Sequence, residues 1–260
     1  MDIISEIKEK KEFKNLPNEI VEVVLSEFKN LDDESEIIKR SREKLRKYFG
    51  IFLTNRIVKP RNILNFDLML KSHLSSSKRD YNLFYTKLFD FEFKGFDRVL
   101  DFGCGVNGFS YPYLQKILKN IEYICFDVSI DIIRNTNTFF DKMKLNNCTC
   151  FYKNLFDFEG TDYFFKKDKN ICVFCFQILD ALDGLKKNFS LDFLNHLKSF
   201  MKENDVLIIS YSLESISGKN RFRTKRKKLL EFINSEFEIL KNFNMYGERF
   251  LILKPKLLKT

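Results

Sequence analysis

The chain has 260 residues, enough for one large α/β domain or for one such domain with a smaller appendage. Hydrophobic residues make up 44% of it and include 30 phenylalanines but no tryptophan, so a core packed mainly with phenylalanine rings is expected. The net charge of +9 suits a polyanionic partner without identifying one. Because no signal-peptide core and no stretch of roughly eighteen uninterrupted apolar residues is present, we expect a cytoplasmic protein without membrane contact. We also expect a monomer.

The N-terminal region is expected to be all helical. Apolar residues recur at helical spacing there, Pro17 and Asn18 form a start signal, Pro60 interrupts the pattern, and the serines of segment 75–79 can cap a helix. The expected helices span residues 19–28, 37–52, 63–74 and from segment 75–79 to about 89.

After Gly95 the pattern changes to strand, turn and helix. This alternation predicts an α/β fold with a mostly parallel seven-stranded sheet, helices on both faces and an antiparallel edge formed by the last two strands. We place the domain boundary between residues 94 and 95 and expect the helical part to pack directly on the sheet. The expected strands span residues 98–102, 122–126, 149–152, 170–176, 205–211, 237–240 and 249–253.

The six cysteines fit a reducing compartment. Cys172 and Cys175 form a C-x-x-C pair, which Cys148 and Cys150 would have to join to make a zinc site. However, residues three apart on a strand point to opposite faces, and the third and fourth strands are not neighbours in a doubly wound sheet. We therefore expect core cysteines and no metal.

Residues 99–108 are an apolar run that ends in an aspartate and then contains three of the nine glycines. In the glycine turn, residues 103–105, Gly103 and Gly105 allow positive φ and a close approach to a ligand, while Asp101 supplies a carboxylate at the strand end. A dinucleotide site needs G-x-G-x-x-G, whereas an acid before a shorter turn suits a ligand with an ammonium group and no phosphate. S-adenosyl-L-methionine is such a ligand.

Asp127 ends another short apolar strand, about twenty residues after the glycine turn, where a dinucleotide fold binds ribose. A carboxylate at this place accepts hydrogen bonds from ribose hydroxyls. The alternative is that the glycines form only a tight turn and that Asp127 caps the next helix. Both elements together at this spacing favour the cofactor site.

Three further segments have distinctive patterns: residues 10–21, residues 73–79 with the form H-x-S-S-x-x-R, and residues 209–219, which approach S-F-P-x-x-S-L-x-G-[KR]. With the glycine turn between them, these segments make the chain resemble the 16S rRNA (guanine-1405, N7)-methyltransferases associated with aminoglycoside resistance. The likeness is collinear over nearly the whole length. It implies a class I methyltransferase, Rossmann-like fold, with a helical RNA-binding domain over 1–94 and an S-adenosyl-L-methionine-dependent domain over 95–260.

The resemblance also implies cofactor contacts. Arg79 would bind the cofactor carboxylate, Gly103 and Gly105 would lie along its methionine part, Asp101 near its amino group and Asp127 on its ribose. A planar guanidinium matches a carboxylate bidentately, which gives Arg79 a physical rationale. The alternative for Arg79 is an exposed charge at a helix start.

Asn154, Leu155 and Phe156 follow the third strand and are candidates for flanking the adenine, although a loop phenylalanine is as often core packing. Gln177, at the end of the fourth strand, is a candidate for positioning cofactor or base, or else a scaffold residue. The chain departs from the family where F-K-L-[LV]-P is replaced by F-Q-I-L-D at 176–180 and S-F-P by S-Y-S at 210–212. Both segments should border the target-base pocket.

The chemistry implied by the resemblance needs no general base. Guanine N7 carries a lone pair on the major-groove edge and can attack a sulfonium methyl group without first losing a proton. The chain has no [DNS]-P-P-[YFW] motif for an exocyclic amine after its fourth strand and no Pro-Cys nucleophile. Rate would then come from in-line alignment of the reacting atoms.

Two basic stretches are candidates for contact with 16S rRNA in the assembled 30S subunit, and their alternative is a solvated charged face. They comprise Lys44, Arg46 and Lys47 in the helical region, and the basic segment 219–228 with Lys219, Arg221, Arg223, Lys225, Arg226, Lys227 and Lys228.

The leading hypothesis is a methyltransferase for guanine N7 in the decoding A-site, conferring aminoglycoside resistance. The alternatives are methylation of another RNA position or of a small molecule, and a ribosome-binding protein without turnover.

Overall fold

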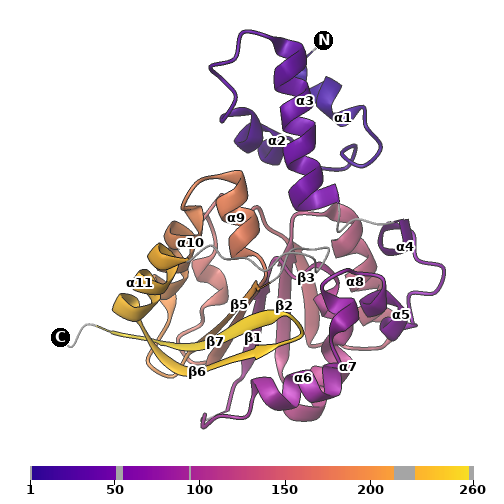
Figure 1. Ribbon diagram of the computed structural model, residues 1–260. Coiled ribbons are helices and arrows are strands. Elements are labelled where there is room, and N and C mark those ends of the chain that lie inside the picture. The colour runs from indigo at the N-terminus through magenta and orange to yellow at the C-terminus, as the bar shows by residue number, and fades with distance from the viewer. Residues whose placement is uncertain (1, 51–54, 94, 214–225, 258–260) are drawn as a thin grey trace.

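A seven-stranded sheet forms the centre of the molecule in the computed structural model, which describes residues 2–50, 55–93, 95–213 and 226–257 (Figure 1). The strand order is β3-β2-β1-β4-β5-β7-β6. The first five strands run parallel, and β7 pairs antiparallel with both β5 and β6, so the expected antiparallel edge is confirmed. The strands are β1 Arg98–Phe102, β2 Glu122–Asp127, β3 Cys148–Tyr152, β4 Ile171–Phe176, β5 Val206–Ser212, β6 Phe237–Met245 and β7 Glu248–Pro255.

Helices cover both faces of this sheet and bury its apolar side chains in two core layers. Every residue of β1 and β4 is buried, as expected for inner parallel strands. One core layer lies against α4–α8 and the other against α9–α11. The helices are α1 Ile3–Lys8, α2 Asn18–Leu25, α3 Glu34–Leu45, α4 Asn55–Val58, α5 Phe66–Lys71, α6 Tyr81–Leu88, α7 Tyr111–Ile117, α8 Ile130–Lys142, α9 Leu179–Leu185, α10 Phe189–Phe200 and α11 Lys227–Glu236.

The N-terminal helices divide into two groups. Helices α1–α3 form a lobe with its own small core, which Leu185 of α9 joins from the sheet part (Figure 1). Helices α4–α6 instead pack in the same core layer as β1 and α7. The expected boundary after residue 94 lies before the first strand, and helices on both sides of it share one core layer.

One expected cap is wrong. Residues 76–78 form a 3₁₀ turn, and the N-cap of α6 is Asp80, whose carboxylate accepts hydrogen bonds from the N–H groups of Asn82 and Leu83, both at 3.1 Å. Aspartate satisfies the free N–H groups of a first turn as well as serine does. The serines therefore do not start this helix.

The four cysteines considered for zinc do not converge. Cys172 and Cys175 lie in different core layers, and strands β3 and β4 are separated by β2 and β1. Among the described helices, none is both long and apolar enough to cross a bilayer.

Candidate functional site

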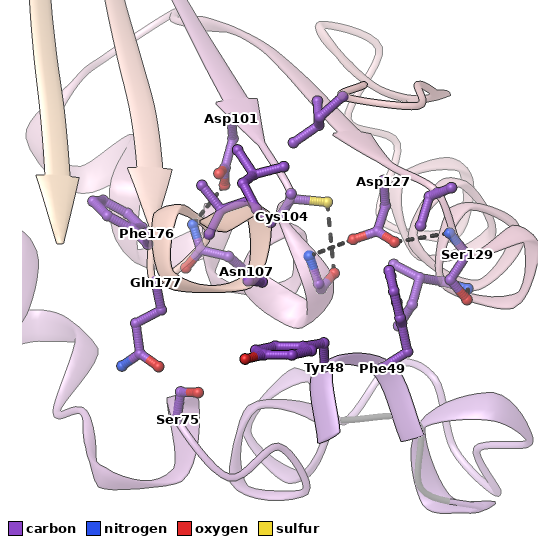
Figure 2. Close-up of a pocket in the computed structure, with 18 of the residues that line it drawn as sticks. Tyr48, Phe49, Ser75, Asp101, Cys104, Asn107, Asp127, Ser129, Phe176 and Gln177 are labelled. Atoms are coloured by element: carbon purple, nitrogen blue, oxygen red, sulfur yellow. Dashed lines mark hydrogen bonds between the residues drawn. The ribbon is translucent and has the colours of Figure 1, made fainter. Parts of the chain in front are cut away.

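A pocket opens at the carboxyl ends of β1, β2 and β4, facing the α1–α3 lobe (Figure 2). This edge is where open α/β sheets bind ligands. Of the residues expected to bind the cofactor, the following line the pocket: Arg79, Asp101, Gly103, Gly105, Asp127, Leu155, Phe156 and Gln177.

The glycine turn has the backbone that its residues predict. Gly103 and Gly105 adopt φ of 66° and 51°. A Cβ on Gly103 would lie 2.7 Å from the Ile178 side chain, so an alanine would crowd Ile178. The positive φ also disfavours alanine at this position. The Gly105 N–H donates to the Asp127 carboxylate at 2.8 Å, which ties the turn to the end of β2.

Asp127 holds two backbone groups at once, because its other oxygen accepts from the Ser129 N–H at 2.9 Å. Ser129 itself caps α8, so the alternative that Asp127 serves as this cap is wrong. Burial raises the pKa of Asp127 to about 6, and the backbone hydrogen bonds from Ser129 and Gly105 oppose this shift. Asp127 is therefore ionised at neutral pH and presents a carboxylate to the pocket.

Asp101 is almost fully buried in a polar network beneath the pocket. Its Oδ2 accepts hydrogen bonds from the Asn107 amide at 2.7 Å and from the Tyr123 hydroxyl at 2.6 Å. Burial raises the pKa of Asp101 to about 7, although both hydrogen bonds lower it. A nearby cation would stabilise the ionised form, which makes this carboxylate responsive to a cationic ligand.

This buried acid predicts a pH-dependent stability. An unfolded aspartate titrates near about 3.9, whereas Asp101 in the folded protein titrates at about 7. Between these values the folded state holds more protons, so the free energy of unfolding should fall as pH rises from about 4 to 7. Asp101→Asn should flatten this part of the profile. Urea denaturation of both proteins at several pH values tests it, and identical pH profiles would contradict the assignment.

Arg79 reaches the pocket from the N-terminal region but is already paired. Its Nε and Nη2 donate to the Glu248 carboxylate of β7 at 2.8–3.0 Å, and the Ser210 hydroxyl donates to the same carboxylate at 2.8 Å. The side chains of Arg79 and Glu248 are 3% and 2% exposed, so the alternative of an exposed charge is wrong. Burial lowers the pKa of Arg79, but Glu248 raises it above its usual value.

The loop after β3 contributes two of its three expected residues. Leu155 and Phe156 line the pocket, and the Phe156 ring also packs on Phe189, with ring centroids 4.7 Å apart. Asn154 is not among the lining residues. Its side-chain oxygen accepts from the Phe156 N–H at 3.0 Å, so it shapes the loop that presents the other two.

Gln177 lines the pocket from a strained backbone. Its φ is 56°, a conformation that residues other than glycine seldom adopt, and its N–H donates to the Ser210 carbonyl at 3.0 Å. Figure 2 shows its side chain pointing toward Ser75 at the pocket mouth. Such strain tends to persist where it aims a side chain at a functional site.

Sequence reasoning missed the aromatic residues that the α1–α3 lobe adds. Tyr48 and Phe49, in the π-helical turn Arg46–Gly50 that extends α3, point into the pocket (Figure 2). A Cβ on Gly184 of α9 would lie 2.0 Å from the Tyr48 ring, so the lobe and the sheet part meet closely here. No local sequence pattern predicts this contact, because Tyr48 and Gly184 are far apart in the sequence.

Sequence reasoning also missed His73, the first residue of segment 73–79, as a pocket residue. It lines the pocket, and its Nε2 lies 3.7 Å from where a Cβ on Gly105 would be. Burial lowers the pKa of His73 to about 4, with a contribution from Arg79. The imidazole is therefore neutral over the glycine turn.

Several of the basic residues form ion pairs within the protein. Lys44 pairs with Glu27 and donates to the Leu185 carbonyl at 3.3 Å, Arg46 pairs with Glu12 at 2.9 Å, and Arg226 forms a bidentate pair with Asp180 at 2.7–3.0 Å. Lys227 is exposed and pairs with Glu231 on its own helix at 3.7 Å, and Lys47 and Lys228 are also exposed. Lys219, Arg221, Arg223 and Lys225 lie outside the described residues.

Comparisons of sequence give no match, either to a protein-family model or to a curated protein. Solved structures do match. The 16S rRNA methylase RmtB is 17% identical with a TM-score of 0.72, covering 98% of both chains. The 16S rRNA methyltransferase RmtF, solved with S-adenosyl-L-homocysteine, is 16% identical with a TM-score of 0.75, covering 98% of this chain and 97% of its own.

The 16S rRNA methylase ArmA is 23% identical with a TM-score of 0.54 over 74% of this chain and 91% of its own. At these identities the likeness concerns the fold, and the fold expected from the resemblance is confirmed. Because RmtB and RmtF match over nearly their whole length, the N-terminal helices belong to the likeness as well. The chain therefore has a class I methyltransferase fold with an N-terminal helical region, shared over its full length with 16S rRNA methylases.

Proposed function

We propose that this protein is an S-adenosyl-L-methionine-dependent methyltransferase that modifies guanine N7 at position 1405 in the decoding A-site of 16S rRNA. The observation that carries the proposal is the pocket, in which a glycine turn lies between Asp101 and Asp127 and faces Tyr48 of the lobe (Figure 2). The full-length fold shared with RmtB and RmtF supports the same reaction class.

The residues present fit the cofactor. Asp127 can accept further hydrogen bonds from ribose hydroxyls, because each carboxylate oxygen has two lone pairs and only one is used by a backbone N–H. Asp101 offers a negative charge to an ammonium group, and Gly103 and Gly105 have no Cβ to block a methionine chain. When bound, the cofactor supplies an electrophilic sulfonium methyl group.

Leu155 and Phe156 supply apolar walls for an adenine ring, while Asn154 holds their loop in shape. Arg79 uses Nε and Nη2 for Glu248, and its Nη1 takes no part in this ion pair. We assign Nη1 to the cofactor carboxylate, beside Tyr81, which also interacts with the guanidinium. In this arrangement Glu248 fixes the orientation of the guanidinium.

The target base would be aligned by Tyr48 and Gln177, which both line the pocket. The Tyr48 ring offers a stacking surface, and the Gln177 amide offers a donor and an acceptor for the edge of a base. Guanine N7 needs no deprotonation, so the protein needs no general base. Its task is to orient the base and to exclude water. Exposed Lys47, Lys227 and Lys228 are available for phosphate contacts.

Transfer of a labelled methyl group tests this function. Purified small subunits are expected to take up one label per subunit, and N7-specific cleavage followed by reverse transcription should map it to the A-site guanine. Lys47→Ala with Lys227→Ala should slow transfer and lower the salt slope of subunit binding by about one per lost phosphate contact.

Lys87→Ala is the matched control, because Lys87 is also a surface lysine but lies on α6, away from the lobe (Figure 1). Transfer to tRNA alone, or to another nucleotide of the subunit, would refute the target. Cells that express the protein and stay sensitive to aminoglycosides would refute the resistance role.

A further inference from the structure

Three cysteines converge at the glycine turn, one within the turn itself and one in each of the neighbouring strands β2 and β3. Cys104 follows β1 within the turn, and Cys125 and Cys150 are direct partners in the register of β2 and β3. Their Sγ atoms all lie within 4.8 Å of one another. This cysteine trio shares only Cys150 with the four cysteines of the zinc alternative.

The trio is buried but has an entrance. All three thiols are free, and Cys104 lines the pocket, so a small solute in the pocket can reach it. Among the described residues, no further cysteine, histidine or carboxylate oxygen joins the group. A tetrahedral zinc site requires a fourth ligand, and this arrangement supplies three sulfurs only.

We infer that Cys104, Cys125 and Cys150 form a binding site for a soft trivalent ion that takes three sulfur ligands, with arsenite as its chemical representative. Three sulfurs bonded at about 2.3 Å to one pyramidal trivalent arsenic would lie about 3.4 Å apart. From separations of at most 4.8 Å, each sulfur would have to move inward by less than about 1 Å. Soft ions select thiolate ligands.

The charge of the complex selects the trivalent ion. Three thiolates with Cu⁺ leave two negative charges and with Zn²⁺ one, whereas a trivalent ion leaves a neutral complex, and an unpaired buried charge is costly. Asp101 of β1 and Asp127 of β2 line the same pocket as Cys104 and add further negative charge.

The binding reaction is an exchange without oxidation. Three As–O bonds of As(OH)₃ break and three As–S bonds form, and each thiol proton leaves with a hydroxide as water. Because Cys104 lies between the two pocket glycines, drawing its sulfur into the complex would move the glycine turn. We therefore expect a filled site to weaken cofactor binding, a consequence that rests on the proposed function.

Native mass spectrometry of the full chain with arsenite tests the site. The expected mass gain is one arsenic atom less three hydrogens, since a complex with only two thiols would retain a hydroxyl. Cys150→Ala should abolish this species. Cys148→Ala is the matched control, because Cys148 lies on the same strand and is buried but stands outside the trio, and it should leave binding intact.

No arsenic adduct, a two-sulfur adduct, equal effects of both substitutions, or preference for Zn²⁺ would overturn the site. The coupling is read separately, by titrating S-adenosyl-L-homocysteine into protein with and without arsenite. A lower affinity with arsenite is expected, at least about tenfold, and an unchanged affinity would overturn the coupling. Failure of the arsenic-free protein to bind S-adenosyl-L-homocysteine would count against the proposed function and not against the thiol site.

Discussion

Replacing Glu248 by glutamine should lower the free energy of unfolding by about 3–5 kcal/mol, because it leaves the Arg79 guanidinium buried without its counter-charge. Both side chains are at most 3% exposed, and the ion pair is bidentate. The Ser210 hydroxyl, which donates to the Glu248 carboxylate, would then donate to an uncharged amide oxygen, a weaker acceptor. Urea denaturation of the folded variant measures the loss.

A matched control is Glu203→Gln. Glu203 is 79% exposed and pairs with Lys254 at 3.7 Å, and such surface pairs contribute about 0–1 kcal/mol. Equal losses for the two variants would contradict the structural role of the buried pair. If Glu248→Gln does not fold, the double variant Arg79→Met, Glu248→Leu should fold, since apolar replacement of a whole buried pair is often tolerated.

Gly103→Ala should weaken binding of S-adenosyl-L-homocysteine by between about fivefold and 150-fold, the equivalent of the 1–3 kcal/mol that overpacking typically costs. The new methyl group would lie 2.7 Å from Ile178, which itself lines the pocket, so both side chain and turn must shift. Titration calorimetry gives the affinity.

Gly160→Ala separates this effect from backbone strain. Gly160 has a φ of 70°, close to that of Gly103, but nothing lies within 4 Å of an added Cβ. Both variants should lose about 1–2 kcal/mol of stability from the left-handed backbone. Only Gly103→Ala should lose affinity, and equal affinities would contradict the place given to the glycine turn.

The inner strands could be predicted closely from the sequence because burial on both faces makes them continuous apolar runs. β1 was predicted with its observed ends, and β4 began within one residue of its predicted start. β6 was predicted four residues long and has nine, since it is an edge strand in which only Phe237 is buried, with a register shift between Ile239 and Lys241. Exposed edges carry little hydrophobic pattern.

The site divides in the same way. The place of Asp101, Gly103 and Asp127 in the pocket could be predicted, because strand ends and turns are local features of the sequence. The partner of Arg79 lies 169 residues away, and the contact of Tyr48 with Gly184 likewise depends on how the lobe meets α9. Such long-range pairs depend on packing between elements, which a single sequence does not reveal.

Calorimetric titration of S-adenosyl-L-homocysteine into the unaltered protein tests the central claim most directly. One molecule should bind per chain, and Asp127→Asn should weaken binding about tenfold or more, as expected for hydrogen bonds to a charged group. Asp157→Asn, which alters an exposed loop aspartate, should leave the affinity unchanged. Absence of binding at high protein concentration, or equal affinities for both variants, would contradict the account.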